Sequence, residues 1–96
     1  MVGYKFSKEE LNRARSVDLG ALLLELDSGR FYTDSCGYIR DYTNEKFKVD
    51  RDKNKYYMNT EMAYSAGNTI EYFAFIVELG FVKAVEMLLA YAEDKR

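Results

Sequence analysis

The hydrophobic period changes twice along this chain, and this change restricts the fold more than any other feature of the sequence. Apolar residues recur at the spacing of one helix face in two places, first Leu19, Leu22, Leu23 and Leu26 and later Ile70, Phe73, Ala74 and Val77. Between them, segment 30–58 alternates aromatic and β-branched residues with polar ones, as in KFKVDRD. The order predicts an α+β fold, with a small antiparallel sheet of three to four short strands flanked by N-terminal and C-terminal helices.

The flanking helices carry recognisable end signals. Ser7 followed by Glu10 has the capping-box spacing, which predicts a first helix near 8–14. Ser16 is the expected cap of a second helix that Gly29 ends, and Gly80 ends a third helix over 68–79. A final helix has an apolar face made of Val82, Val85, Leu88, Leu89 and Ala92.

Several chemistries lack the residues that they require. A chain of 96 residues predicts one compact domain over 1–96, which is too short for a multidomain enzyme. It has no histidine and one cysteine, Cys36, so it supplies neither a Ser-His-Asp or Cys-His nucleophile nor four zinc ligands. Asp50 and Asp52 are typical of a solvated hairpin tip rather than of a Mg²⁺-dependent nuclease. We therefore expect a protein without catalytic activity, metal or cofactor.

The charge and the N-terminal segment restrict location and partners. The start, MVGYKFSKEE, lacks the apolar run of a secretory signal, and no stretch is long and apolar enough to span a bilayer. A lone cysteine fits a reducing compartment, so we expect a cytoplasmic protein without membrane contact. With 14 basic and 16 acidic residues, the chain has a formal charge of −2, so its surface as a whole does not attract phosphate groups. Any nucleic-acid contact must be local.

The segment AGNTIEYFAFIVELGFVKAVEMLLA resembles the C-terminal part of the zinc-binding domain of bacterial DNA primases, and of primase-like domains encoded on mobile elements with relaxases and topoisomerase-primase modules. There, a Gly-Asn or Gly-Asp pair opens a helix with an Ile-Asp/Glu step, and a Gly-x-Phe-x-x-Ala-Val-Glu-x-Leu run forms the next helix. The matching residues are Gly67, Asn68, Ile70 and Glu71, then Gly80, Phe81, Ala84, Val85, Glu86 and Leu88. The N-terminal FSKEELNRARSVDLGALLLEL is also similar to the opening of the mobile-element domains, with Val17, Asp18 and Leu19 in the matching helix.

The chain departs from this family at the metal site. Primase zinc domains carry Cys-x-x-Cys or Cys/His pairs around the central hairpin, whereas YYMNTEMAYSAGN contains no ligand residue. The resemblance therefore implies a zinc-finger fold without zinc, encoded by a phage, a plasmid or another mobile element. Aromatic packing must then replace the stabilisation that the ion supplies, and the candidates are Tyr56, Tyr57, Tyr64, Tyr72 and Phe73.

A basic and aromatic segment suggests one function, an accessory module for single-stranded nucleic acid in a primase or relaxase system. It combines phosphate-binding charge with stacking rings, namely Lys46, Lys48, Arg51, Lys53 and Lys55 with Tyr56 and Tyr57. Primase zinc domains are thought to help read single-stranded template, so the resemblance points the same way. Glu45, Asp50 and Asp52 weaken the local field, and a solvated strand face is the competing interpretation.

Acidic C-terminal helices suggest another function, which the sequence favours slightly. Small acidic proteins of phages and plasmids, anti-CRISPR proteins among them, often occupy grooves built for nucleic acid. Here the chain would be an inhibitor that binds a host protein or ribonucleoprotein complex in defence or nucleic-acid processing. The expected contact residues are Glu71, Glu78 and Glu86, with Tyr38, Tyr42 and Tyr64 as aromatic anchors. A solvated helical surface would carry the same charges.

Overall fold

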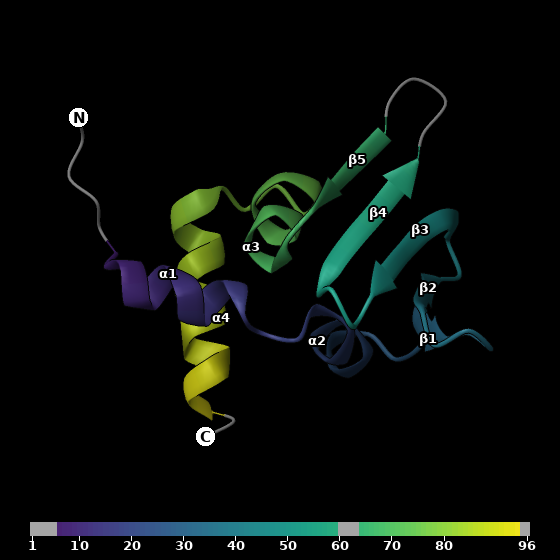
Figure 1. Cartoon of the computed structure of the whole chain (residues 1–96), viewed down its shortest axis with the longest axis horizontal. Helices are drawn as coiled ribbons and strands as arrows, with labels where there is room; N and C mark the ends of the chain where they lie inside the picture. The colour runs from purple at the N-terminus through teal and green to yellow at the C-terminus, as the bar shows by residue number, and fades with distance from the viewer. Residues whose placement is uncertain (1–5, 60–63, 95–96) are drawn as a thin grey trace. The chain divides into compact units, whose positions relative to one another are not determined.

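The computed structural model describes residues 6–59 and 64–94, in which helices precede and follow the strands along the chain, an α+β order (Figure 1). The chain divides into two compact units, one over Asp18–Asn68 and the other from the chain up to Val17 together with the chain from Thr69 onward. In the described part of the chain, no helix has the length and apolar character needed to cross a bilayer.

The unit Asp18–Asn68 contains a five-stranded antiparallel sheet in which each strand pairs with the next along the chain. Its strands are β1 (Phe31–Thr33), β2 (Ile39–Asp41), β3 (Asn44–Asp50), β4 (Lys55–Asn59) and β5 (Tyr64–Gly67). The sheet has more strands than the three to four expected, because β5 has the sequence YSAG. This sequence lacks alternation of large apolar residues, and its backbone pairs with β4.

The two faces of the sheet differ because side chains alternate along β3. Phe47, Val49 and Tyr56 are buried on the side we call the inner face. Lys48 and its cross-strand partner Tyr57 are half-buried on the opposite side, the outer face. Helix α2 (Leu19–Leu26) packs against β1 and β3, and its buried leucines are Leu19, Leu22 and Leu23. Leu26, the fourth leucine of the helix face read from the sequence, does not join this core and is 59% exposed.

Helix α2 begins and ends at residues other than those expected. Its N-cap is Asp18, whose Oδ1 accepts a hydrogen bond from the Ala21 N–H at 3.1 Å, whereas Ser16 ends the preceding helix. It ends at Leu26, before Gly29. The helix also lies close to the sheet, because a Cβ atom on Gly20 would be 2.8 Å from Cγ1 of Ile39. Glycine is therefore required at this position.

The other unit is helical. Helix α1 (Lys8–Arg15) has the predicted capping box, with Ser7 Oγ accepting from the Glu10 N–H at 3.1 Å and Glu10 Oε1 accepting from the Ser7 N–H at 2.9 Å. It packs against α4 (Phe81–Asp94). The buried Thr69 hydroxyl donates to the Val17 carbonyl at 2.9 Å and so joins the two chain segments of this unit.

The third helix is not the continuous α-helix expected over 68–79. A short helix α3 (Thr69–Glu71) leads into the π-helix η1 (Tyr72–Ile76), in which the Val77 N–H bonds to the Tyr72 carbonyl at 3.1 Å. The wider turn rotates Val77 away from the buried Phe73 and Ala74, with which it shares the expected helix face, and Val77 is 44% exposed. Glu78 and Gly80 then end the helix with positive φ angles of 66° and 84°.

A buried carboxylate organises the β2–β3 hairpin. Asp41 is 4% exposed. Its two oxygens share the Arg30 Nε–H, at 3.3 Å to Oδ1 and 3.1 Å to Oδ2, and Oδ2 accepts a second bond, at 3.0 Å, from Arg30 Nη2. Asp41 also accepts from the Thr43 N–H at 2.7 Å and the Thr43 hydroxyl at 2.6 Å. Burial by itself raises the pKa of Asp41, but the hydrogen bonds from Arg30 and Thr43 outweigh it and hold the pKa below its ordinary value.

We expect Asp41→Asn to lower the free energy of unfolding at neutral pH by about 1–2 kcal/mol, because it leaves Arg30 without its anionic partner. A lowered carboxyl pKa stabilises the folded state above the unfolded value of about 4 and loses that effect as the pH falls below it. The free energy of unfolding, measured with denaturant from neutral to acidic pH, should therefore decrease less for Asp41→Asn than for the wild type. Asp52→Asn, the same change on an exposed turn, is the control. If the free energy of unfolding has the same pH dependence in both variants, the Asp41 carboxylate does not stabilise the fold in this way.

Candidate nucleic-acid interface

A row of side chains crosses the outer face of the sheet at right angles to the strands. The pairing register places Tyr32 of β1 opposite Arg40 of β2, Arg40 opposite Lys48 of β3, and Lys48 opposite Tyr57 of β4. Opposed residues in antiparallel strands project to the same face, so this row has a tyrosine ring at each end and two cations between them.

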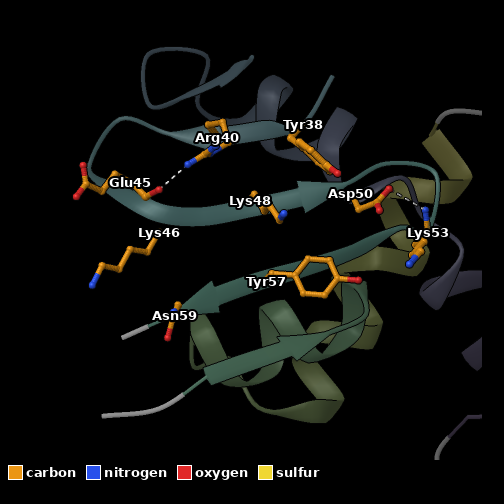
Figure 2. Close-up of a pocket in the computed structure, with 9 residues that line it drawn as sticks. All are labelled: Tyr38, Arg40, Glu45, Lys46, Lys48, Asp50, Lys53, Tyr57 and Asn59. Atoms are coloured by element: carbon orange, nitrogen blue, oxygen red, sulfur yellow. Dashed lines mark hydrogen bonds between the residues drawn. The ribbon is translucent and has the colours of Figure 1, made fainter. Parts of the chain in front are cut away.

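Lys48 lies at the centre of the row, between two aromatic rings. Its Nζ is 4.5 Å from the centroid of the Tyr38 ring and 5.8 Å from that of Tyr57. Figure 2 shows the three side chains in succession, with Tyr38 just before β2, Lys48 on β3 and Tyr57 on β4. The cation–π contacts orient the ammonium group while it stays within reach of an anion.

Asp34 fixes the position of Tyr38. Its Oδ1 accepts hydrogen bonds from the backbone N–H groups of Cys36 and Tyr38, both at 2.9 Å. Its Oδ2 lies 3.4 Å from Nη1 of Arg40. Desolvation raises the pKa of Asp34, but these hydrogen bonds and Arg40 outweigh it and lower the pKa, which favours the charged acceptor that the loop requires.

Arg40 holds a bulge in β3. Arg40 of β2 pairs with Lys48, but the next residue of β2, Asp41, pairs with Asn44. Segment 45–47 of β3 therefore has no regular partner on β2. The Arg40 guanidinium fills this gap, with Nε donating to the Phe47 carbonyl at 3.1 Å and Nη2 donating to the Glu45 carbonyl. Arg40 therefore adds positive charge to the face but is committed to the main chain.

The outer face is hollowed around these residues, with a volume of about 570 Å³. Its lining has four cationic and two anionic side chains, and the full set is Tyr38, Arg40, Glu45, Lys46, Lys48, Asp50, Lys53, Tyr57 and Asn59. The hollow is thus locally positive although the whole chain is negative. An open, positive hollow with aromatic rings suits a ligand that combines phosphates with flat bases.

The structure brings together only part of the predicted nucleic-acid set. Lys46, Lys48, Lys53 and Tyr57 line the hollow, and Lys55 is exposed on β4 outside its lining. Arg51 instead pairs with Asp18 at the start of α2, with Nη2 and Oδ2 2.8 Å apart. Tyr56 is not available for stacking on a base. It is 2% exposed on the inner face, since its neighbour Tyr57 takes the outward position on the strand.

Sequence reasoning missed two contributors to the hollow, Arg40 and Asn59. The two-residue period of a strand could have identified them. Arg40 follows buried Ile39 and so lies on the opposite face, and Asn59 is two residues from Tyr57 and so lies on the same face as Tyr57. That signal requires knowing which strands are neighbours. A single strand does not supply this information.

The residues predicted for protein binding are distributed over both units. Glu71 is half-buried on α3, and Glu78 and Glu86 are exposed after η1 and on α4. Tyr38 belongs to the hollow described above, and Tyr42 is exposed in the β2–β3 connection. Tyr64 begins β5, but its side chain lies outside the described part of the structure.

The described residues do not fit a structural metal ion. Cys36 is exposed in the β1–β2 loop, and within segments 6–59 and 64–94 no three acidic or cysteine side chains converge on one point. Of the aromatic residues proposed to replace zinc, Tyr56, Tyr72 and Phe73 are buried. Comparisons of this chain with protein-family models, curated proteins and solved structures find no match.

The role assigned to Arg40 predicts a local effect of its removal. Arg40→Gln should expose the 44–48 backbone to hydrogen exchange and lower the free energy of unfolding by about 1–2 kcal/mol, because two carbonyl groups lose a charged donor. Hydrogen exchange with mass spectrometry would measure this change. Lys46→Gln is the control, because it removes a nearby positive charge and keeps the backbone N–H that donates to Asn44 Oδ1. Unchanged protection of 44–48 in Arg40→Gln would show that the side chain does not hold the bulge.

Proposed function

We propose that this protein is a non-catalytic module that binds single-stranded nucleic acid through the outer face of its sheet. The observation that carries the proposal is the placement of Lys48 between the Tyr38 and Tyr57 rings in a positive hollow. Bases stack on aromatic side chains, while phosphates require cations at intervals along the strand. The resemblance to primase zinc domains supports the same function.

Single strands fit this face better than a duplex. In a duplex the flat surfaces of the bases are stacked on one another and are not accessible to a protein ring, whereas in a single strand they are exposed. Tyr38 and Tyr57 offer ring surfaces to such bases, and the lining residues of the hollow belong to β2, β3, β4 and the segments beside them. The two carboxylates of the lining, Glu45 and Asp50, keep the net excess of charge small. We therefore expect moderate, salt-sensitive binding.

Lys48→Gln and Tyr57→Ser should each weaken binding of a labelled oligothymidylate by about ten-fold. Only Lys48→Gln should also reduce the slope of log affinity against log salt, by about 0.7 for each lost phosphate contact. Fluorescence anisotropy at several salt concentrations measures both quantities. The matched control is Lys83→Gln, an exposed lysine of α4. Absence of wild-type binding at low salt, or equal losses in Lys48→Gln and Lys83→Gln, would contradict the proposal.

A second candidate function is inhibition of a host protein or ribonucleoprotein complex by direct binding, the role suggested by the acidic helices. A specific observation in the helical unit favours it, namely large apolar side chains exposed around the end of η1. These are Phe75 at 66%, Val77 at 44%, Phe81 at 49% and Val82 at 42%. Glu78, among them in the chain, has a φ of 66°, which a non-glycine residue adopts at a cost that function often explains.

Glu78→Gly separates stability from binding. Glycine relieves the positive φ, so the free energy of unfolding should rise by about 0.5–1 kcal/mol, while loss of the carboxylate should reduce retention of a protein partner. Affinity capture from nuclease-treated bacterial lysate compares the wild type with Glu78→Gly, with Phe75→Ser, and with Glu93→Gln as a charge control. If a protein is retained equally by Glu78→Gly, Phe75→Ser and the wild type, this surface is not where it binds.

A further inference from the structure

A second pair of aromatic rings belongs to the outer face, beyond the hollow. The Tyr42 ring lies against the Tyr32 ring, with centroids 4.3 Å apart and planes inclined by 30°. Tyr42 is 69% exposed, so its ring adds little to the core. Its backbone is nevertheless fixed, because its N–H donates to the Arg30 carbonyl at 2.8 Å. An exposed ring on a fixed backbone is a ready stacking surface.

This pair extends the transverse row already described. Tyr32 is opposite Arg40, and the row continues through Lys48 to Tyr57. Three strand spacings of about 4.8 Å separate β1 from β4, a span of about 14 Å. The spacing of about 3.4 Å per nucleotide in one strand of a duplex is a lower limit for a strand whose bases stack on protein rings, so this span corresponds to at most about four nucleotides.

The charges favour a path across the strands over a path along β3. Along β3, the lining has a carboxylate near each end, Glu45 and Asp50, which repel phosphates. Across the sheet, the paired positions between the two aromatic stations are Arg40 and Lys48, both cationic, and Asp34 offsets part of the charge of Arg40 alone. Charge complementarity therefore follows the transverse row.

We propose that the Tyr32–Tyr42 pair is a second base-stacking subsite, so that a single strand crosses the sheet from Tyr57 on β4 to Tyr42 beside β1. This inference rests on the proposed function. Bases stack on the aromatic side chains at the two ends, and Lys48 contacts the phosphates between them. Arg40, tied to the main chain of β3, provides a fixed positive floor beneath the strand.

The test uses the full chain and labelled oligothymidylates of about two to about eight nucleotides, with binding measured by fluorescence anisotropy. Wild-type affinity should rise with length and level off beyond about four nucleotides. Tyr42→Ser should bind the longer oligonucleotides about ten-fold more weakly than the wild type and the shortest ones almost equally. Tyr42→Phe should keep the wild-type dependence of affinity on length, because it keeps the ring. Thermal unfolding of both variants checks that the exposed position tolerates the change.

Failure of the second subsite and failure of the proposed function give different results. If Tyr42→Ser matches the wild type at every length while Lys48→Gln still weakens binding, the transverse subsite is wrong and the proposed function stands. If the wild type binds no oligothymidylate at low salt, both the function and the subsite are overturned.

Discussion

The alternation of side chains along β3 is the constraint on which the candidate interface depends. Phe47 and Val49 are buried on the face against which α2 packs, so Lys48 must project from the opposite face. A register slip of one residue would exchange the two faces and bury a lysine. The close approach of Gly20 to Ile39 and the Arg51–Asp18 pair hold α2 to this unit, and thereby help to keep the register that orients Lys48.

Polar groups of the same unit shape the outer face without belonging to the proposed contacts. Asp34 holds Tyr38 beside Lys48, Arg40 fills the bulge of β3, and Asp41 organises the hairpin that carries Tyr42. Each of these groups is charged and hydrogen-bonded within the protein, so the face is preorganised before a ligand arrives. The acidic residues of the unit are therefore compatible with an anion-binding face, because several of them are engaged by backbone donors or arginine.

The sheet unit and the helical unit present different surfaces. In the sheet unit, cations and tyrosine rings share one face, which suits phosphates and bases. In the helical unit, the π-helix turns apolar side chains outward next to Glu78, which suits a protein surface. The sequence did not indicate the π-helix, because a spacing of i, i+3, i+4 and i+7 predicts a regular α-helix. The wider turn that rotates Val77 comes from the hydrogen bond between the Val77 N–H and the Tyr72 carbonyl.

The sequence by itself determined the α+β order, the capping box at Ser7, three to four of the five strands and the alternation that buries Phe47 and Val49, because these follow from local periodicity and end signals. Only the tertiary structure decided that β5 pairs with β4, that Arg51 turns to Asp18 and that Tyr56 enters the core. It also decided that Tyr32, Arg40, Lys48 and Tyr57 form one row. Register between strands depends on pairing and packing across long chain separations, which local pattern does not encode.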